Sequence, residues 1–267
     1  MRKKLNILTM AYMLFLVLLI LSANLPGHWS SIVYYLAFIL PIVISLFMSG
    51  EKSDPLGYLR IDRAGVNLAT PLLFPTISLV MLISYVTSLI IFAITGKTNS
   101  VDLGDSYVLA LITHALIPAI FEEALFRYLP MRLIAPHSPR CAIIISSIFF
   151  GIVHMDLFSI PYALLAGFVF MAVDLATESV VPSVIIHFIN NALSVSFMFI
   201  RFDYIIFLLY LLIAALTVTS VILIIKNKDE YETALIIITE KGEGVKITPQ
   251  MILFVVITLA FSVINLL

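Results

Sequence analysis

The chain has 267 residues, of which 62% are apolar and only 12% are charged, whereas about 25% of the residues are charged in a typical soluble domain. This composition excludes a soluble globular fold of this length, because the outer surface of such a fold must be polar, and it makes membrane lipid the expected surroundings. The net charge of −1 and the lack of basic runs interleaved with aromatic residues exclude nucleic acid as an expected partner, and the single cysteine, Cys141, excludes an internal disulfide.

Apolar stretches follow one another along most of the chain. A helix that crosses a bilayer needs roughly 20 apolar residues. The candidate stretches are 5–25, 30–49, 71–95, 106–134, 140–158, 160–177, 180–200, 203–226 and 250–267. They predict an all-α fold, a polytopic transmembrane helix bundle of about eight or nine spans. We interpret 1–267 as a single membrane domain with a motif-bearing catalytic core at about 106–200.

The loops between these stretches differ in Lys and Arg content, which sets the orientation of short loops. The basic residues of the N-terminal side are Arg2, Lys3, Lys4, Lys52, Arg60, Arg63, Arg127, Arg132, Arg140, Lys226, Lys228, Lys241 and Lys246, and the opposite loops hold Lys97 and Arg201. We therefore expect a multi-pass integral membrane protein with a cytoplasmic N-terminus, which would lie in the plasma membrane if the host is bacterial. Nine spans would put Leu267 outside.

Residues 232–247 contain an apolar run that is too short to cross a membrane. A β-branched run, a Gly-rich turn and a second short run follow one another there. This order is typical of a hairpin. It predicts a small cytoplasmic β-hairpin over 232–247.

Three charged residues lie well inside one span: Glu122, Glu123 and Arg127. Each costs roughly 2.5–3.5 kcal/mol when exposed to lipid, so such residues usually face a cavity or a partner. Glu123 and Arg127 are four residues apart, with the acid first, which is the favourable order for an ion pair on one helix face. Glu122 is rotated by roughly 100° from Glu123 and lacks a partner on its own helix. We interpret Glu122 as a candidate general base.

Two histidines lie inside later spans. His154 ends the sequence Phe150-Gly-Ile-Val-His154, and His187 begins His187-Phe-Ile-Asn-Asn191, so that Asn191 follows His187 by one turn on the same face. At 1.5 Å per residue, Glu122 and His154 lie roughly 15 and 21 Å from the cytoplasmic boundary, and His187 about 12 Å. These depths allow the three side chains to face one cavity.

Together these side chains form a hydrolytic set. Glu122 with His154 can activate a water molecule, and His187 with Asn191 can donate hydrogen bonds to the oxyanion of a tetrahedral intermediate. No serine or cysteine stands out as a nucleophile, which favours direct attack by water.

The three motifs resemble those of the CAAX prenyl protease family, also called the abortive-infection family. Glu122-Glu-Ala-Leu-Phe-Arg127 is similar to its EExxxR motif, Phe150–His154 to FxxxH, and His187–Asn191 to HxxxN. The resemblance implies an intramembrane endopeptidase whose site is sunk in the bilayer and open to the cytoplasm. It also implies that Glu122 is the base with His154 as its partner, that His187 and Asn191 stabilise the oxyanion, and that Glu123 and Arg127 shape the site. The expected substrate is a membrane-associated peptide or protein, of prenylated or bacteriocin type.

Two questions stay open at the level of sequence. The family has been classed as metallopeptidases, and Glu122, His154 and His187 are possible zinc ligands. We expect no cofactor, because Asn191 suits an oxyanion site better than a zinc site. The same residues also occur in alternative functions: a non-catalytic membrane scaffold or bacteriocin self-immunity protein, or a proton-coupled transporter that uses Glu and His as a relay.

Overall fold

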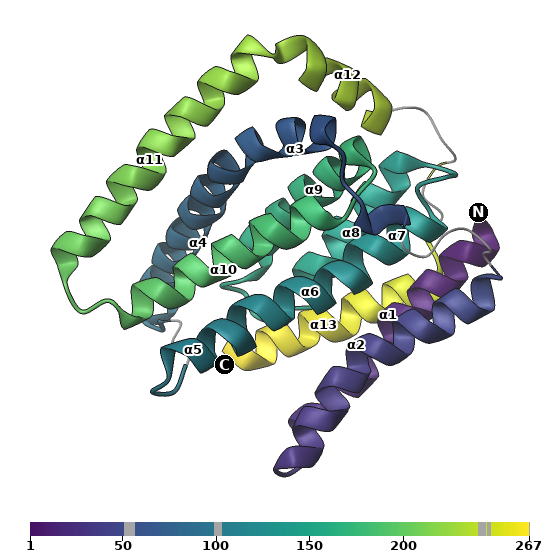
Figure 1. Cartoon of the computed structure of the whole chain (residues 1–267). Helices are drawn as coiled ribbons and strands as arrows, with labels where there is room; N and C mark the ends of the chain where they lie inside the picture. The colour runs from purple at the N-terminus through teal and green to yellow at the C-terminus, as the bar shows by residue number, and fades with distance from the viewer. Residues whose placement is uncertain (51–56, 99–102, 240–243, 245–246, 267) are drawn as a thin grey trace.

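Helices account for the secondary structure of the described chain, as the sequence predicts (Figure 1). The computed structural model describes residues 1–50, 57–98, 103–239, 244 and 247–266. Eight helices within these ranges are long and apolar enough to cross a membrane. The all-α transmembrane fold class is therefore confirmed.

The elements follow one another without long described loops. The α-helices are α1 (Arg2–Ala23), α2 (His28–Ser49), α3 (Arg63–Ala69), α4 (Leu73–Thr95), α5 (Tyr107–Ala110), α6 (Ile117–Glu123), α7 (Leu129–Leu133), α8 (Pro139–Ile152), α9 (Ile160–Thr177), α10 (Val181–Phe199), α11 (Asp203–Lys226), α12 (Lys228–Thr239) and α13 (Pro249–Leu266). The 3₁₀ turns are η1 (Gly57–Leu59) and η2 (Thr70–Leu72). The π-helical turns η3 (Leu111–Leu116) and η4 (Ala124–Tyr128) interrupt the span that runs from Tyr107 to Leu133.

Helix α8 is shorter than the span predicted over 140–158. It has 14 residues, or about 21 Å of helix, whereas the hydrocarbon core is about 30 Å thick. The chain leaves the helix after Ile152 and turns back through Asp156, whose carboxylate accepts hydrogen bonds from Phe158 N and Ser159 Oγ. This local turn competes with helix continuation, and the apolar composition of 140–158 does not reveal it.

The prediction of a β-hairpin over 232–247 is wrong for residues 232–239, which the structure describes. Residues 232–239 form the last two thirds of helix α12. Asp229 and Glu230 in the first turn of this helix stabilise it, because their negative charges lie at its positively polarised N-terminus. Glu232 and Ala234, which follow, have high helix propensity. These signals outweigh the β-branched run at 236–239. The rest of the expected hairpin falls mainly on 240–243 and 245–246, outside the described residues.

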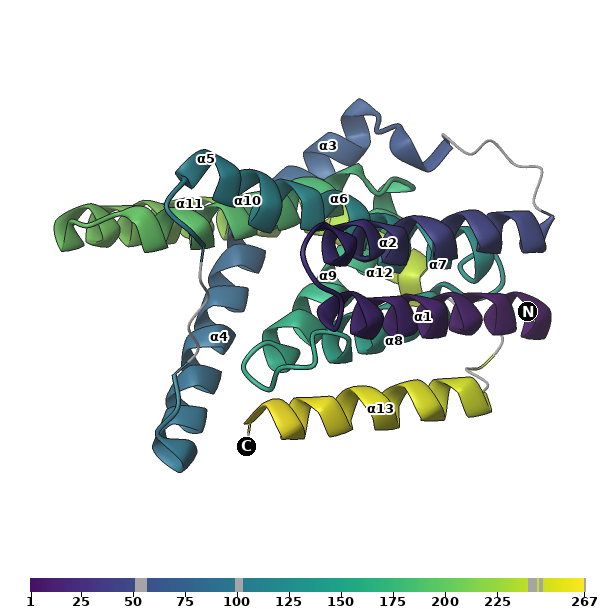
Figure 2. The ribbon, with the colours of Figure 1, turned by 90° about the horizontal axis from the view of Figure 1, so that it is seen from below.

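Successive long helices and α8 run in alternate directions, so that the two termini lie at opposite ends of the bundle (Figures 1 and 2). We call these ends the Arg2 end and the Asn265 end. At the Arg2 end, Val180 N donates to Tyr58 O at 2.9 Å. At the Asn265 end, Asn265 Nδ2 donates to Met155 O at 2.9 Å. Alternation places the starts of α8 and α10 at the Arg2 end, and the starts of α5, α9 and α11 at the Asn265 end.

Helices α8 and α9 approach closely through two glycines. A Cβ atom added at Gly167 would lie 2.9 Å from the Ser147 Cα atom, and one added at Gly151 would lie 3.1 Å from the Leu164 Cα atom. Small residues of this kind allow close packing of transmembrane helices, where van der Waals contact rather than the hydrophobic effect drives association. The close approach fixes the end of α8, just before the turn that contains His154, against α9.

We expect Gly167→Val to destabilise the protein, because the added side chain overlaps the backbone of α8. Overpacking of this kind typically costs about 1–3 kcal/mol. Thermal unfolding in detergent should show a lower midpoint for this variant. Phe168→Val is the matched control, because the Phe168 side chain is 51% exposed on the outer face of the same helix. Equal midpoints for the two variants would contradict the described α8–α9 contact.

Candidate active site

Two adjacent glutamates of α6 face different surroundings. Glu123 is fully buried within the bundle, whereas the Glu122 side chain is 19% exposed and lines a cavity. The sequence predicts this divergence, because neighbouring residues of a helix point about 100° apart. The π-helical turn η4 begins directly after Glu123. Such turns are frequent at functional sites.

Glu123 is the centre of a buried ionic network that joins two helices. Its Oε2 atom lies 3.0 Å from Arg127 Nε, and its Oε1 atom lies 2.7 Å from His187 Nδ1 on α10. The ion pair expected between Glu123 and Arg127 is thus present. The contact with His187 was not predicted, since it joins residues 64 positions apart in sequence.

Arg127 is held by groups from two further helices. Its Nη1 atom donates to Ser146 Oγ of α8 at 3.3 Å, and Ser146 Oγ donates in turn to the Phe126 carbonyl at 2.5 Å. The guanidinium carbon lies 4.2 Å from the centre of the Phe150 ring and 5.4 Å from that of Phe170. The cation–π contacts and the ion pair together compensate for the burial of this charge.

A second buried carboxylate, Asp174, connects α9 to the start of α10. The sequence places Asp174 at the edge of a span, but its side chain is fully buried. Ser183 donates to it through both its backbone N–H, at 3.1 Å, and its hydroxyl group, at 2.6 Å. Ser183 is one turn before His187, so this bridge orients the segment that carries the histidine.

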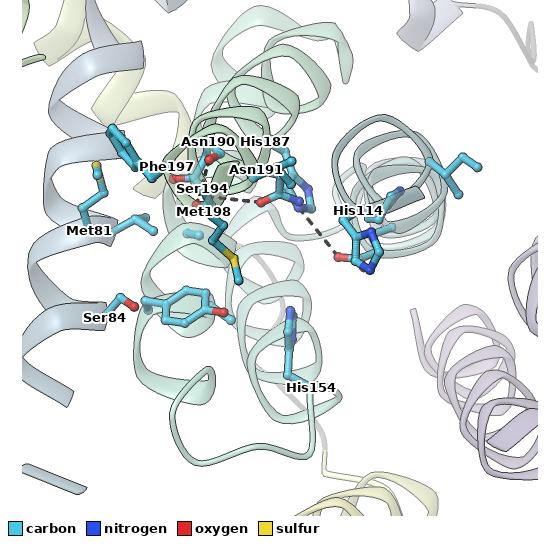
Figure 3. Close-up of a pocket in the computed structure, with 18 of the residues that line it drawn as sticks. Met81, Ser84, His114, His154, His187, Asn190, Asn191, Ser194, Phe197 and Met198 are labelled. Atoms are coloured by element: carbon cyan, nitrogen blue, oxygen red, sulfur yellow. Dashed lines mark hydrogen bonds and ion pairs between the residues drawn. The ribbon is translucent and has the colours of Figure 1, made fainter. Parts of the chain in front are cut away.

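The four residues expected to perform chemistry line one cavity of about 810 Å³ (Figure 3). These residues are Glu122, His154, His187 and Asn191. Glu122 Oε2 lies 3.9 Å from His187 Nε2 and has no hydrogen-bond partner within the described chain. A separation of 3.9 Å is too long for a direct hydrogen bond, but one oxygen atom about 2.8 Å from both would fit with an angle of about 90°.

Hydrogen bonds fix the orientation of the two histidine rings. His154 Nδ1 lies 2.8 Å from the Phe150 carbonyl oxygen, which can only accept, so Nδ1 carries the proton in this contact. His187 Nδ1 likewise donates to the Glu123 carboxylate. The Nε2 atom of each ring is therefore the one available to water or substrate. The sequence places these residues on helical faces, but it does not predict which nitrogen is available.

Further polar residues around the cavity were not predicted to take part. His114 is exposed and faces the cavity, where its Nδ1 atom lies 2.8 Å from Thr113 Oγ1 (Figure 3). Tyr34 of α2 and Tyr162 of α9 also line it and interact electrostatically with Glu122. No sequence pattern indicates that Tyr34 lies near Glu122, because the two residues are far apart in sequence. Tyrosines are also common near membrane interfaces, so the residue type alone is not informative.

Glu122, His154 and His187 are the residues that would hold a zinc ion. The available Nε2 atoms suit coordination, since a ligating histidine usually donates its other N–H to a neighbouring acceptor. However, no group of three His, Cys, Asp or Glu side chains in the described ranges is close enough together to hold a metal ion. As placed, these residues do not form a three-ligand site.

Fold and site together define a polytopic α-helical membrane protein with a carboxylate, two histidines and an amide around a cavity inside its helix bundle. Residues 104–193 match the family model of type II CAAX prenyl endopeptidase Rce1-like proteins. The matched segment contains all three motifs, so the resemblance expected from the sequence is confirmed there. No curated protein and no solved structure matches the chain.

We expect Arg127→Ala to destabilise the fold, because it leaves the Glu123 carboxylate buried without its charge partner. Breaking a buried ion pair in this way typically costs about 3–5 kcal/mol. The melting temperature and the yield of membrane-inserted protein should both fall. Glu122→Gln, five positions earlier and facing the cavity, is the control and should keep the stability of the unmodified protein. A fully stable Arg127→Ala variant would contradict a structural role for the pair.

Proposed function

We propose that this protein is an intramembrane endopeptidase of the CAAX type that hydrolyses a peptide bond by direct attack of water. The observation that carries the proposal is the Glu122 carboxylate, which projects without a hydrogen-bond partner into a cavity that it shares with His154, His187 and Asn191. A carboxylate inside a membrane protein is costly, and such residues usually mark function. The substrate that the resemblance implies is a membrane-associated peptide, of prenylated or bacteriocin type.

Glu122 is proposed to accept a proton from the attacking water, and His154 is proposed to assist as its partner. His154 donates its Nδ1 proton to the Phe150 carbonyl, so its neutral ring presents Nε2 as an acceptor toward the cavity. Glu122 takes one water proton as the oxygen attacks the substrate carbonyl carbon. The same proton then passes to the leaving amine when the carbon–nitrogen bond breaks.

His187 has to be doubly protonated in order to stabilise the oxyanion. Its Nδ1 proton is already donated to Glu123, so donation to substrate needs a second proton on Nε2. The contact with the Glu123 carboxylate at 2.7 Å fixes the ring so that Nε2 is directed away from Glu123. Glu123 is thereby a positioning residue for the reaction, in addition to its pairing with Arg127.

Asn191 supplies the second proposed donor. Its Oδ1 atom accepts a hydrogen bond from Asn190 Nδ2 at 3.2 Å. This contact fixes the amide orientation and leaves the Asn191 Nδ2 protons free to donate into the cavity. A pair of donors from one face of α10, His187 and Asn191, then binds the oxygen that becomes negatively charged in the tetrahedral intermediate.

We expect Glu122→Gln and His154→Ala to abolish cleavage without loss of folded protein. Asn191→Ala should retain measurable activity, because the loss of one oxyanion donor typically reduces the rate by about 10²–10³-fold. Mass spectrometry of peptides from host membranes that carry each variant provides the measurement. Ser88→Ala, which lines the same cavity on α4, is the control and should cleave normally. Unchanged peptide products with Glu122→Gln would contradict the mechanism and favour the scaffold or immunity function.

The role of zinc is tested separately. Purified active protein should contain well under one equivalent of zinc and should keep its activity after slow treatment with a strong chelator. The reason is that a catalytic zinc site needs three converging protein ligands. Stoichiometric zinc, together with activity that is lost on chelation and restored by zinc addition, would establish a metallopeptidase instead.

A further inference from the structure

The cavity of the candidate site extends from the middle of the bundle, beside His187 and Glu122, toward the Asn265 end. Along α10, its lining residues begin at His187 and continue to Met198, next to the end of the helix at Phe199. On the span from Tyr107 to Leu133, which runs the opposite way, no described lining residue lies beyond Glu122. Both helices therefore place the cavity between the depth of His187 and Glu122 and the Asn265 end.

The other walls agree with this placement. On α9, which starts at the Asn265 end, the lining residues extend from Tyr162 to Phe170, within the first two thirds of the helix. On α11, which also starts there, the described lining residue is Tyr210. A second cavity of about 540 Å³ shares Tyr34, Glu122 and His154 with the first and continues to Asn24 and Asn265. Both cavities thus approach the same end of the molecule.

Exposure along α10 shows where the first cavity opens. His187 is only 6% exposed, Asn190 and Asn191 are half-buried, Ser194 is exposed and Met198 is 56% exposed. These residues line the cavity and follow one another along α10 toward its end at Phe199. Substrate therefore reaches Glu122 from the leaflet or the water at the Asn265 end.

The basic residues gather at the other end. The described Lys and Arg residues in the loops and helix termini of the Arg2 end are Arg2, Lys3, Lys4, Arg60, Arg63, Arg132, Arg140, Lys226 and Lys228, whereas Lys97 and Arg201 are those of the Asn265 end. Short loops rich in Lys and Arg stay in the cytoplasm. A cytoplasmic N-terminus and a site open to the cytoplasm, both expected from the sequence, are therefore incompatible in this structure.

We propose that the orientation follows the basic residues and that the site opens to the extracytoplasmic side. The inference rests on the proposed peptidase function and narrows its substrate to peptides that are exported or that lie in the outer leaflet. Among the described residues that line the two cavities, none is Lys or Arg, and Glu122 is the one acid. The segment that enters the site is accordingly uncharged, flanked by Tyr, Ser, Asn and Met side chains of the walls.

Accessibility to a membrane-impermeant maleimide tests this orientation without any need for activity. In a Cys141→Ala background, single cysteines are placed at Ser194 and Met198, in the mouth of the cavity, and at Lys228, at the Arg2 end. Cys141 itself is buried, so its removal affects no exposed surface. In right-side-out vesicles we expect labelling at 194 and 198 and none at 228, and the reverse pattern in inside-out vesicles.

Two outcomes overturn the proposal. One is labelling at position 228 from outside, and the other is labelling at neither 194 nor 198 from outside. Either outcome leaves the peptidase function untouched. The function has its own readout, which is cleavage of an impermeant peptide added to right-side-out vesicles, compared with Glu122→Gln. Outside labelling without Glu122-dependent hydrolysis of any membrane or added peptide would retain the orientation and reject the peptidase.

Discussion

The buried contact between Glu123, Arg127 and His187 is the interaction on which the rest of the site depends. It places a carboxylate and a guanidinium, both with 0% exposure, inside a bundle that lipid surrounds. Charges in such a place are tolerated only when they compensate one another. Compensation here requires the π-helical turn that carries Arg127, the hydroxyl group of Ser146 on α8 and the ring of His187 on α10. One network therefore sets the relative positions of the helices that carry the motifs.

The same network separates two glutamates that look alike in sequence. Glu123 has its charge satisfied by Arg127 and His187, whereas Glu122 lines the cavity and its Oε2 atom has no hydrogen-bond partner in the described chain. Rotation by about 100° along one helix is sufficient to separate the buried anion, Glu123, from the proposed base, Glu122. His187 serves both parts, because one ring nitrogen contacts Glu123 and the other faces Glu122.

Local patterns in the sequence predict what lies on one helix, and they fail where distant helices meet. The Glu123–Arg127 pair and the divergence of Glu122 follow from residue spacing alone, and the composition predicts the fold class. The contact of His187 with Glu123 and the bridge from Asp174 to Ser183 join separate helices, so no spacing rule reveals them. The early end of α8 and the helix at 228–239 were missed for another reason. A capping carboxylate and a favourable helix start decide these segments, and hydropathy does not register either.

The short helix α8 also bears on how water enters a membrane-embedded site. At about 21 Å it leaves the backbone that follows Ile152 within the depth of a bilayer of about 30 Å. Lipid cannot hydrogen-bond to such backbone groups, so protein or water must provide their hydrogen-bond partners. The side chains of Asp156 and Asn265 form hydrogen bonds with two of these groups, Phe158 N and Met155 O. A hydrated, locally thinned bilayer beside His154 would form hydrogen bonds with the others, and it would bring water to the residues proposed to activate it.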